Sequence, residues 1–277
     1  MKICFLTARP DHPLLAATEK LLAPTHEVTH QPPPPSPSSL PSLPLSPSSP
    51  SSPLADVYLL KSRTPEALAL ARSYEERGAR VLNSAAATEL CQDRTAMAAL
   101  ALQAGLPFAR THTPGTLTHL TSLPALPLPL PLVVKSRHSR RDDLVARADT
   151  PAQLRALAAD WPDEPVVIQQ FTPNSGWDHK LWAIADQVFA ARRRSELSDT
   201  PTTPPPPPLT PTDLPPSWLT LVRTVGKVFA LDVYGVDVIT TPTGTPLIVD
   251  INAFPGIRNQ PGAPEALTAL ALRAAEG

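Results

Sequence analysis

Short apolar runs alternate with helically spaced apolar positions along the first 84 residues. A run of four to six apolar residues is typical of a buried strand, whereas apolar residues three or four positions apart are typical of a helix. Strands are expected at residues 2–7, 26–30, 56–61 and 80–83, and helices at 13–22 and 65–77. This order of elements predicts a small α/β layer.

The pattern continues with more helices and strands in the remaining two thirds of the chain. Residues 85–104 are typical of two helices, and Gly105 is a common residue at the end of a helix. Further strands are expected at residues 132–136 and 165–171 and as a pair within 180–194, and further helices at 151–160, 217–230 and from 263 onward.

Proline is concentrated in three stretches, since the chain has 38 prolines against only 10 glycines. These stretches lie at residues 31–53, 121–131 and 200–216. Proline lacks the backbone donor that a strand or helix needs, so we expect these residues to form inserts between elements, the first of them disordered. A polyproline docking segment is the functional alternative, and a tolerated surface insertion is the simpler explanation.

Composition and charge exclude several classes of protein. The formal net charge of −1 gives no electrostatic basis for binding nucleic acid or a membrane surface. Cys4 and Cys91 are the only cysteines, which excludes a disulfide framework and fits a reducing compartment. No apolar run reaches the roughly 20 residues of a spanning helix, and charge and proline interrupt the first residues too early for a signal peptide. We therefore expect a cytoplasmic protein with no nucleic-acid or membrane partner.

A predicted hairpin near the end of the chain carries the main candidate for chemistry. Two β-rich runs flank a Thr-Pro-Thr-Gly turn, and we expect Thr241 and Pro246 to close it. Counting back along both strands then places Asp237 directly opposite Asp250, with Asn252 on the same face. Like charges opposite each other destabilise a sheet, so two carboxylates and an amide oxygen favour a bound hard cation such as Mg²⁺. A solvated surface hairpin is the alternative, but both acids lie inside apolar runs.

Five segments resemble motifs of the ATP-grasp enzymes in order and spacing, and are most similar to the RimK-type and glutathione-synthetase-like branch. They are LVVK (132–135), VIQQF (167–171), HKLWAI (179–184), YGVDVI (234–239) and VDINAFPG (249–256). The resemblance covers about residues 80–277. It implies an ATP-grasp domain of two α+β subdomains at residues 85–277, preceded by a pre-ATP-grasp α/β domain at residues 1–84.

The resemblance also implies ATP and two Mg²⁺ ions as cofactors, with Mn²⁺ a possible substitute. Lys135 would contact the α- and β-phosphates. Gln169, Gln170 and Phe171 would line the adenine hinge through backbone hydrogen bonds and a flat apolar contact, although an ordinary strand end is the alternative. Asp237, Asp250 and Asn252 match the metal ligands of the family.

Cations on the following strands would neutralise the γ-phosphate as it transfers. In a strand, Arg192 and Arg194 share one face while Arg193 points away. We therefore expect one face only to act, that of Arg192 together with Lys180, and a solvated surface charge is the alternative for Arg193. Arg258 follows the FPG turn, from which it could reach an anionic group of the substrate.

The sequence departs from the family pattern at two positions expected to bind phosphate. The loop after Lys135 is usually rich in glycine, which lets backbone N–H groups approach phosphate, but residues 136–143 contain none. His138, Arg140 and Arg141 could substitute for it, or the loop could face the second substrate. Arg94 stands where the family often has lysine, and we expect it to contact the nucleotide with a different geometry.

The resemblance implies an ATP- and Mg²⁺-dependent ligase that joins a carboxylate to an amine through an acyl phosphate. Its partners would be a small molecule or peptide with a carboxylate and an amine acceptor. A small-molecule kinase of the inositol-phosphate kinase type is the alternative, favoured by the cationic loop at residues 137–141. A third hypothesis is a nucleotide-binding protein without turnover, and the opposed carboxylates argue against it.

Overall fold

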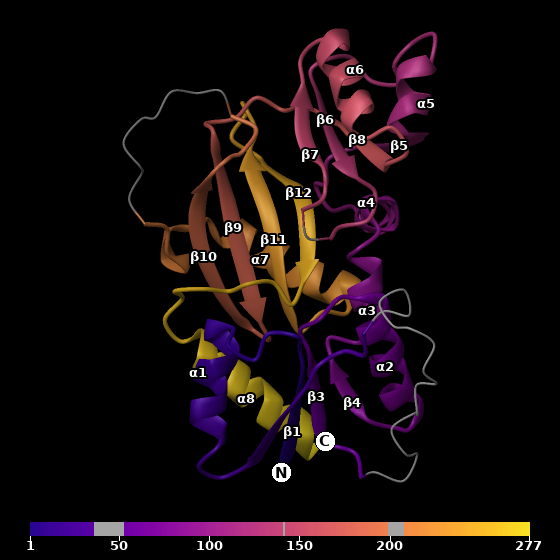
Figure 1. Cartoon of the computed structure of the whole chain (residues 1–277). Helices are drawn as coiled ribbons and strands as arrows, with labels where there is room; N and C mark the ends of the chain where they lie inside the picture. The colour runs from indigo at the N-terminus through magenta and orange to yellow at the C-terminus, as the bar shows by residue number, and fades with distance from the viewer. Residues whose placement is uncertain (36–52, 141, 199–207) are drawn as a thin grey trace, which may run out of the picture.

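The computed structural model describes residues 1–35, 53–140, 142–198 and 208–277. These residues form three four-stranded sheets, here called the first, second and third sheets (Figure 1). The first sheet lies at the bottom of the view, the third above it and the second at the top. The chain is thus a mixture of helices and strands, as predicted. Among the described residues, no helix has the length and apolar character needed to cross a membrane.

The first sheet is parallel, with strand order β2-β1-β3-β4. Its strands are β1 (Lys2–Leu6), β2 (Glu27–Gln31), β3 (Val57–Leu60) and β4 (Arg80–Leu82). The helices against it are α1 (Pro13–Leu22), α2 (Pro65–Glu76) and α8 (Ala263–Glu276). Alternate residues of β1 point to opposite faces: Ile3 and Phe5 pack with α1 and α8, while Cys4 and Leu6 pack with α2.

The last helix of the chain therefore covers the first sheet, although the sequence assigned it to the second domain. The division between residues 84 and 85 stays a prediction.

The second sheet is antiparallel, with strand order β5-β8-β6-β7. It consists of β5 (Thr111–Thr116), β6 (Leu132–Ser136), β7 (Val145–Ala148) and β8 (Pro165–Gln170). Helices α5 (Leu117–Ser122) and α6 (Pro151–Asp160) pack on one face through a cluster of leucines and valines. Strands β5 and β7 and helix α5 were not predicted, because β5 (THTPGT) and α5 (LTHLTS) have few apolar residues and β7 has only four residues.

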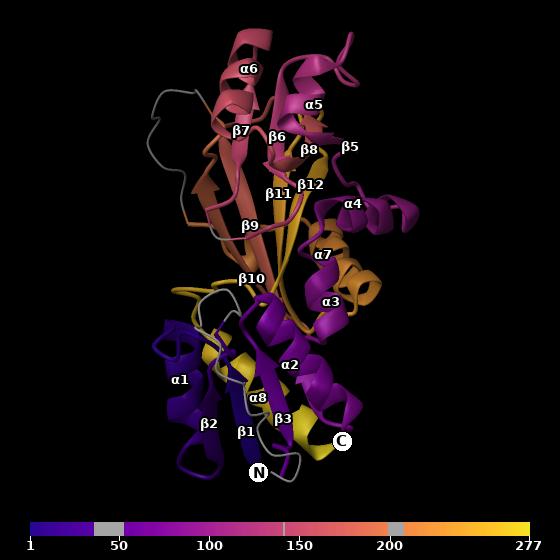
Figure 2. The same cartoon turned by 45° about the vertical axis from the view of Figure 1, so that its right-hand side comes forward.

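The third sheet is also antiparallel, with strand order β10-β9-β11-β12. It consists of β9 (Trp177–Ile184), β10 (Gln187–Arg194), β11 (Val233–Thr240) and β12 (Pro246–Ala253). Helices α3 (Ala85–Leu90), α4 (Arg94–Gln103) and α7 (Pro216–Phe229) bury one face of it in the largest apolar cluster, and the short helix η2 (Pro211–Asp213) precedes α7 (Figure 2). The opposite face carries the polar residues of β9, β11 and β12 and is left for a site.

The inserts fall mainly between these elements. Residues 36–52 of the first insert and 199–207 of the third lie outside the described residues, so the disorder expected there stays a prediction. The second insert, expected from residue 121, begins inside the last turn of α5.

Asn83 joins the first sheet to the third. Its side chain is fully buried, and its amide nitrogen donates to the carbonyl oxygen of Val233 at 2.6 Å. Its Oδ1 accepts from the backbone N–H groups of Asp232 and Val233 at 2.7 and 2.9 Å. One side chain thus satisfies three backbone groups at the start of β11 and sets how this strand leaves the first sheet.

We expect Asn83→Ala to lower the free energy of unfolding by about 2–4 kcal/mol, because it leaves buried backbone groups unpaired. Urea unfolding followed by circular dichroism would measure the change. The matched control is Gln103→Ala, which removes an exposed amide at the end of α4 and should change stability by less than about 0.5 kcal/mol. Equal effects of the two substitutions would contradict the role of Asn83.

Candidate active site

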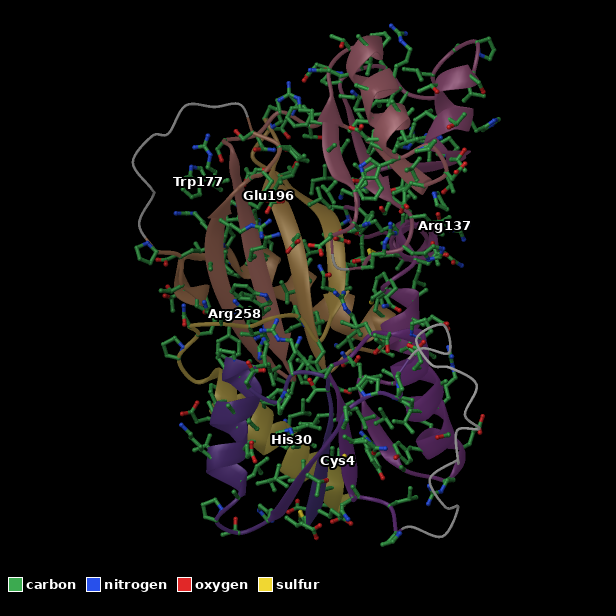
Figure 3. The ribbon with its side chains drawn as sticks, viewed as in Figure 1. Cys4, His30, Arg137, Trp177, Glu196 and Arg258 are labelled. Carbon is green, nitrogen blue, oxygen red and sulfur yellow. The ribbon has the colours of Figure 1, made fainter. Side chains whose placement is uncertain are left out.

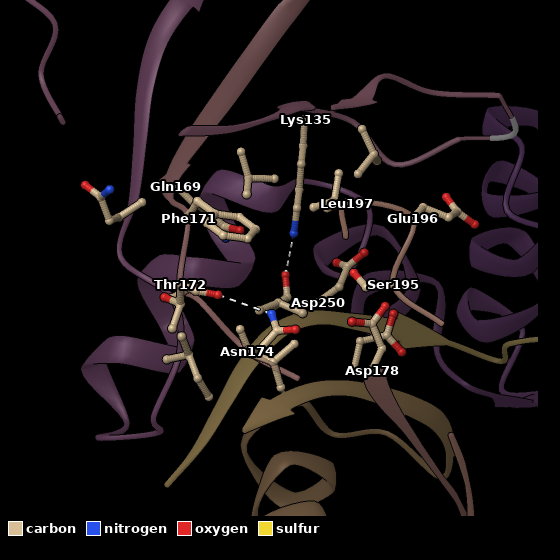
Figure 4. Close-up of a pocket in the computed structure, with 18 of the residues that line it drawn as sticks. Lys135, Gln169, Phe171, Thr172, Asn174, Asp178, Ser195, Glu196, Leu197 and Asp250 are labelled. Carbon is tan, nitrogen blue, oxygen red and sulfur yellow. Dashed lines mark hydrogen bonds between the residues drawn. The ribbon is translucent and has the colours of Figure 1, made fainter. Parts of the chain in front are cut away.

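A cavity of about 170 Å³ lies between the second and third sheets (Figure 4). Strands β6 and β8 line it from one side, and β9, β11 and β12 line it from the other. The predicted site residues that it brings together are Arg94, Lys135, Gln169, Gln170, Phe171, Lys180, Asp237 and Asp250. Residues separated by as many as 156 positions in the chain therefore line one space.

A row of charges crosses the third sheet at this cavity. Asp237 lies directly opposite Asp250 in the β11–β12 pair and directly opposite Lys180 in the β11–β9 pair. The Nζ of Lys180 lies 2.5 Å from a carboxylate oxygen of Asp237. Burial and the neighbouring Asp250 raise the pKa of Asp237, and Lys180 opposes that shift. The predicted opposition of the two carboxylates is confirmed.

The turn of this hairpin differs from the prediction. Pro246 pairs with Thr240 rather than with Thr241, which alone would have moved Asp250 out of register with Asp237. A β-bulge between Asp237 and Val238 adds one residue to β12 and restores the opposition.

The bulge also presents a backbone carbonyl to the second sheet. The Nζ of Lys135 donates to the carbonyl oxygen of Val249 at 2.7 Å, and Figure 4 shows the lysine extending from β6 toward Asp250. The side chain is 5% exposed, and burial lowers its pKa to about 8, although Asp250 opposes that shift. Lys135 is thus held in the cavity by a hydrogen bond and forms no direct ion pair with the described residues.

Arg94 connects Asp250, a predicted metal ligand, to the loop after β6. Its guanidinium lies 2.6 Å from Asp143 and 3.3 Å from Asp250, and it donates to the carbonyl oxygen of Ser136 at 2.8 Å. Burial disfavours the charge, but Asp250 and Asp143 more than offset this and raise the pKa of Arg94. A lysine has a single nitrogen and could not hold these three groups in this geometry, which gives arginine a specific function at this position.

The other cations of that loop face away from the cavity. Arg137 forms two hydrogen bonds with Asp93 at 2.7 and 3.2 Å, and Arg140 forms two with Glu164 at 2.7 and 2.8 Å. In Figure 3, Arg137 lies beside α4, on the other side of the view from Glu196, which lines the cavity. The expectation that Arg140 could replace the glycine-rich phosphate loop is therefore not supported, and Arg141 lies outside the described residues.

The end of β8 carries the three residues expected at an adenine hinge. Gln169 donates to the hydroxyl of Thr111 at 2.9 Å, and Gln170 donates to the carbonyl oxygen of Pro131 at 3.0 Å. The backbone N–H of Phe171 also donates to Pro131, so this group is already bonded within the protein.

A flat apolar contact is available beside these residues. Apart from Phe171, the cavity is lined by the apolar side chains of Val133, Val145, Leu197, Ile239 and Leu247, and the guanidinium of Arg147 lies 4.0 Å from the centre of the Phe171 ring.

Three predicted site residues do not line the cavity: Arg192, Asn252 and Arg258. The placement of Arg192 beside Lys180 is wrong, since Lys180 pairs with Ala191 and Arg192 pairs with His179. His179 faces α7, since the centre of its ring lies 5.0 Å from that of Trp218. Arg192 pairs with His179 and therefore lies on this α7 face, opposite the face that carries Lys180.

Asn252 and Arg258 lie farther along the chain from the carboxylates. Asn252 lies opposite Gly235, two residues beyond Asp250 and on the same face, so it extends the charged row at the edge of the cavity. Arg258 lies past the end of β12, toward the first sheet (Figure 3).

Several lining residues were missed by the sequence reasoning: Thr172, Asn174, Asp178, Arg193, Ser195 and Glu196. Asp178 lies two residues before Lys180, so the period of a strand places it on the same face. Arg193 pairs with Asp178, and the two-residue turn between Ile184 and Gln187 fixes this register. Counting across that turn would have selected Arg193 instead of Arg192.

The oxygen donors fit a hard cation. Asp237 and Asp250 come from adjacent strands, and an amide oxygen follows at Asn252. Within the described ranges no cluster of three or more His, Cys, Asp or Glu residues is placed to hold a metal. Two carboxylates and an amide oxygen suit Mg²⁺, which takes one or two protein carboxylates and completes its shell with phosphate and water.

No protein-family model and no curated protein matches the sequence. The structure resembles a RimK domain ATP-grasp protein from Sphaerobacter thermophilus DSM 20745, with a TM-score of 0.71 and 20% identity over 98% of this chain and 100% of the other. It also resembles the ATP-grasp ligase PsnB, solved with a minimal precursor, with a TM-score of 0.66 and 18% identity over 98% of both chains.

A third similar structure is the macrocyclase MdnC from Microcystis aeruginosa MRC, solved with the precursor peptide MdnA. Its TM-score is 0.65, at 14% identity over 98% of this chain and 99% of the other. The chain has the ATP-grasp fold, as the order of its motifs predicted.

The buried Lys135 predicts a dependence of stability on alkaline pH. Its pKa of about 8 in the folded protein lies below its ordinary value of 10.5, so the unfolded chain binds more protons between these values. The free energy of unfolding contributed by this group therefore rises with pH across that window. Relative to Lys135→Met, the wild type should gain on the order of 2–3 kcal/mol between pH 7.5 and 10.5, measured by urea unfolding. The control Gln103→Met should give a constant difference, and a constant difference for Lys135→Met would contradict the prediction.

Proposed function

We propose that the protein is an ATP- and Mg²⁺-dependent ligase that joins a carboxylate to an amine through an acyl phosphate. The observation that carries this proposal is the charged row of Lys180, Asp237 and Asp250, with Lys135 and Arg94 directed at it from other elements. Such an arrangement suits a polyphosphate with a bound cation. The fold supports the proposal, since the similar structures include enzymes of the ligase kind.

Each part of the cavity has a proposed task. Asp237, Asp250 and Asn252 would hold Mg²⁺, with Mn²⁺ as a substitute, and the bound ion would neutralise charge on the phosphates. Lys135 and Lys180 would contact the phosphates as point charges.

The base would occupy the apolar end of the cavity. Its plane would lie against the aliphatic side chains around Phe171, next to Gln169 and Gln170.

The reaction that follows needs no covalent nucleophile from the protein. A carboxylate oxygen of the substrate attacks the γ-phosphorus and ADP leaves. The amine then attacks the acyl carbon and inorganic phosphate leaves. The chain holds the reactants in place and stabilises the charge on the transferring group through Lys180 and Arg193, both of which line the cavity.

The substrates are proposed as a carboxylate carried by a small molecule or peptide and an amine acceptor. MdnC was solved with a precursor peptide and PsnB with a minimal precursor, which supports a peptide among the candidates. The absence of a nucleic-acid partner and the cytoplasmic location remain predictions from composition.

The kinase alternative loses part of the feature that favoured it, as far as the described residues of the loop go. A polyphosphorylated substrate would need free cations on the loop after β6, but Arg137 and Arg140 are paired with Asp93 and Glu164. A binding protein without turnover is the remaining alternative, because Lys180 and Arg94 already pair with the opposed carboxylates, and the turnover measurement below separates it from the ligase.

The fate of the γ-phosphate tests the proposal. With Mg²⁺, labelled ATP and pooled amino acids, peptides and inositol phosphates, we expect free phosphate only when a carboxylate and an amine are both present. Label retained on a polyol would indicate the kinase instead. Asp250→Asn should reduce phosphate release at least 100-fold with an unchanged circular dichroism spectrum, because it removes one of two opposed metal ligands. The control Asp160→Asn, at the exposed end of α6, should be fully active.

The register of β10 predicts which arginine acts. Arg193→Ala should lower kcat about tenfold or more, because this side chain lines the cavity. Arg192→Ala, its neighbour on the opposite face, should stay within about twofold of the wild type. Steady-state phosphate release measures both variants, and a larger loss for Arg192→Ala would contradict the assignment.

A further inference from the structure

A second group of basic residues lies outside the cavity, at the carboxyl ends of β1 and β3. Arg9 and His12 follow β1, Lys61 and Arg63 follow β3, and Arg258 comes from the loop after β12. We call these five residues the switch-point cluster. They are close enough to act on one another: Arg63, Arg258 and Arg9 each lower the pKa of Lys61, to which burial contributes most.

The loop after β12 packs against this cluster. Lys61 donates to the carbonyl oxygen of Phe254 at 2.8 Å and lies 5.6 Å from the centre of its ring. A Cβ built on Gly256 would lie 3.6 Å from Nε2 of His12 and 4.0 Å from Nε of Arg258. The strand that carries Asp250 therefore continues directly into the cluster.

The switch-point cluster has a surplus of positive charge. Within the described part of the chain, Arg9, Lys61, Arg63 and Arg258 form no ion pair, whereas Arg94, Arg137 and Arg140 are all paired. Asp11 is the acid that acts on His12, and it does not prevent burial and three cations from lowering the pKa of His12 to about 4. His12 is therefore neutral near pH 7.

A solvated cationic surface does not account for this arrangement. His12 is only 6% exposed, and its Nδ1 has no hydrogen-bond partner within the protein. His12 is also the residue before the first turn of α1, so the positive end of that helix dipole adds to the cluster. A buried polar atom without a partner and unpaired cations together call for an anion.

The topology of the first sheet provides the position for such a ligand. From β1 the chain crosses by α1 to β2 on one side, whereas from β3 it crosses by α2 to β4 on the other. In an open parallel sheet, a crevice forms outside the carboxyl ends of two neighbouring strands whose connections diverge, and ligands bind there. Arg9, His12, Lys61 and Arg63 lie on the two loops that border this crevice.

We propose that the switch-point cluster binds a second anionic group of the acid substrate. The substrate would then be a small acid with a carboxylate or phosphate in addition to the carboxyl group that reacts. The assignment to a substrate rests on the proposed ligase function, whereas the anion site itself does not.

The test compares matched pairs of acids that differ by one anionic group. Isothermal titration of the full chain, without ATP or Mg²⁺, would measure glutarate against butyrate and 3-phosphoglycerate against glycerate. We expect at least one dianion to bind tenfold or more tightly than its monoanion. The pair with the larger ratio identifies the second group as a carboxylate or a phosphate.

Variants locate the preference within the cluster. The double variant Arg9→Ala/Arg63→Ala removes two cations whose side chains form no hydrogen bond in the described structure, and should reduce the ratio at least fivefold. Arg155→Ala, on the exposed face of α6, is the control and should preserve it. A ratio near one in both pairs, or a ratio unchanged in the double variant, would overturn the proposal.

Titration of ATP with Mg²⁺ into the same samples separates this proposal from the proposed function. Dianion preference without nucleotide binding would support the anion site and refute the ligase. Nucleotide binding and turnover without dianion preference would refute the anion site and leave the ligase supported.

Discussion

Two carboxylates of like charge, Asp237 and Asp250, lie directly opposite each other on the wall of a cavity, and much of the structure compensates for their repulsion. Lys180 on β9 offsets the first, and Arg94 on α4 offsets the second. Lys135 on β6 adds a third cation above them. These three cations come from different elements, so the charge of one hairpin organises the contact between the second and third sheets and the helix beside them.

The bulge in β12 joins two requirements in one local distortion. It restores the opposition of the carboxylates after a turn whose closing pair is shifted by one residue from the pattern. It also accompanies the contact of the Val249 carbonyl with Lys135 of the second sheet. A regular hairpin with the same turn would have placed Asp250 out of register. The bulge is therefore part of the site, consistent with the frequent occurrence of bulges beside active sites.

The contrast between paired and unpaired cations distinguishes the two polar regions. Arg94 in the cavity and Arg137 and Arg140 on the loop after β6 are each paired with acids of the chain, which restrains this glycine-free loop. At the carboxyl ends of β1 and β3 the cations have no acidic partner among the described residues, and Lys61 is subject to the charges of Arg63, Arg258 and Arg9. Positions far apart along one strand, β12, connect the two regions.

The sequence by itself determined the features that depend on neighbours in the chain. The alternation of apolar residues located the strands of the first and third sheets. The hairpin pattern also led to the pairing of Asp237 with Asp250, but this pairing holds only because the bulge in β12 cancels a one-residue shift at the turn, and the pattern did not predict either feature. The face of Arg193 was equally local and could have been counted from the turn before Gln187. The weakly apolar strands β5 and β7 were not predicted, because the short runs that form them gain their stability from packing rather than from pattern.

Only the tertiary structure decided which distant groups meet. Nothing in the spacing of residues 94, 143 and 250 indicates that the guanidinium of Arg94 would contact both Asp143 and Asp250. Nor does the sequence indicate that Lys135 on β6 would reach the carbonyl oxygen of Val249 on β12. The same holds for the ion pairs that turn the loop cations away and for Arg258 beside the loops of the first sheet. These contacts depend on how sheets stack and on the cost of burying an unpaired charge, which a linear pattern of apolar and polar residues does not contain.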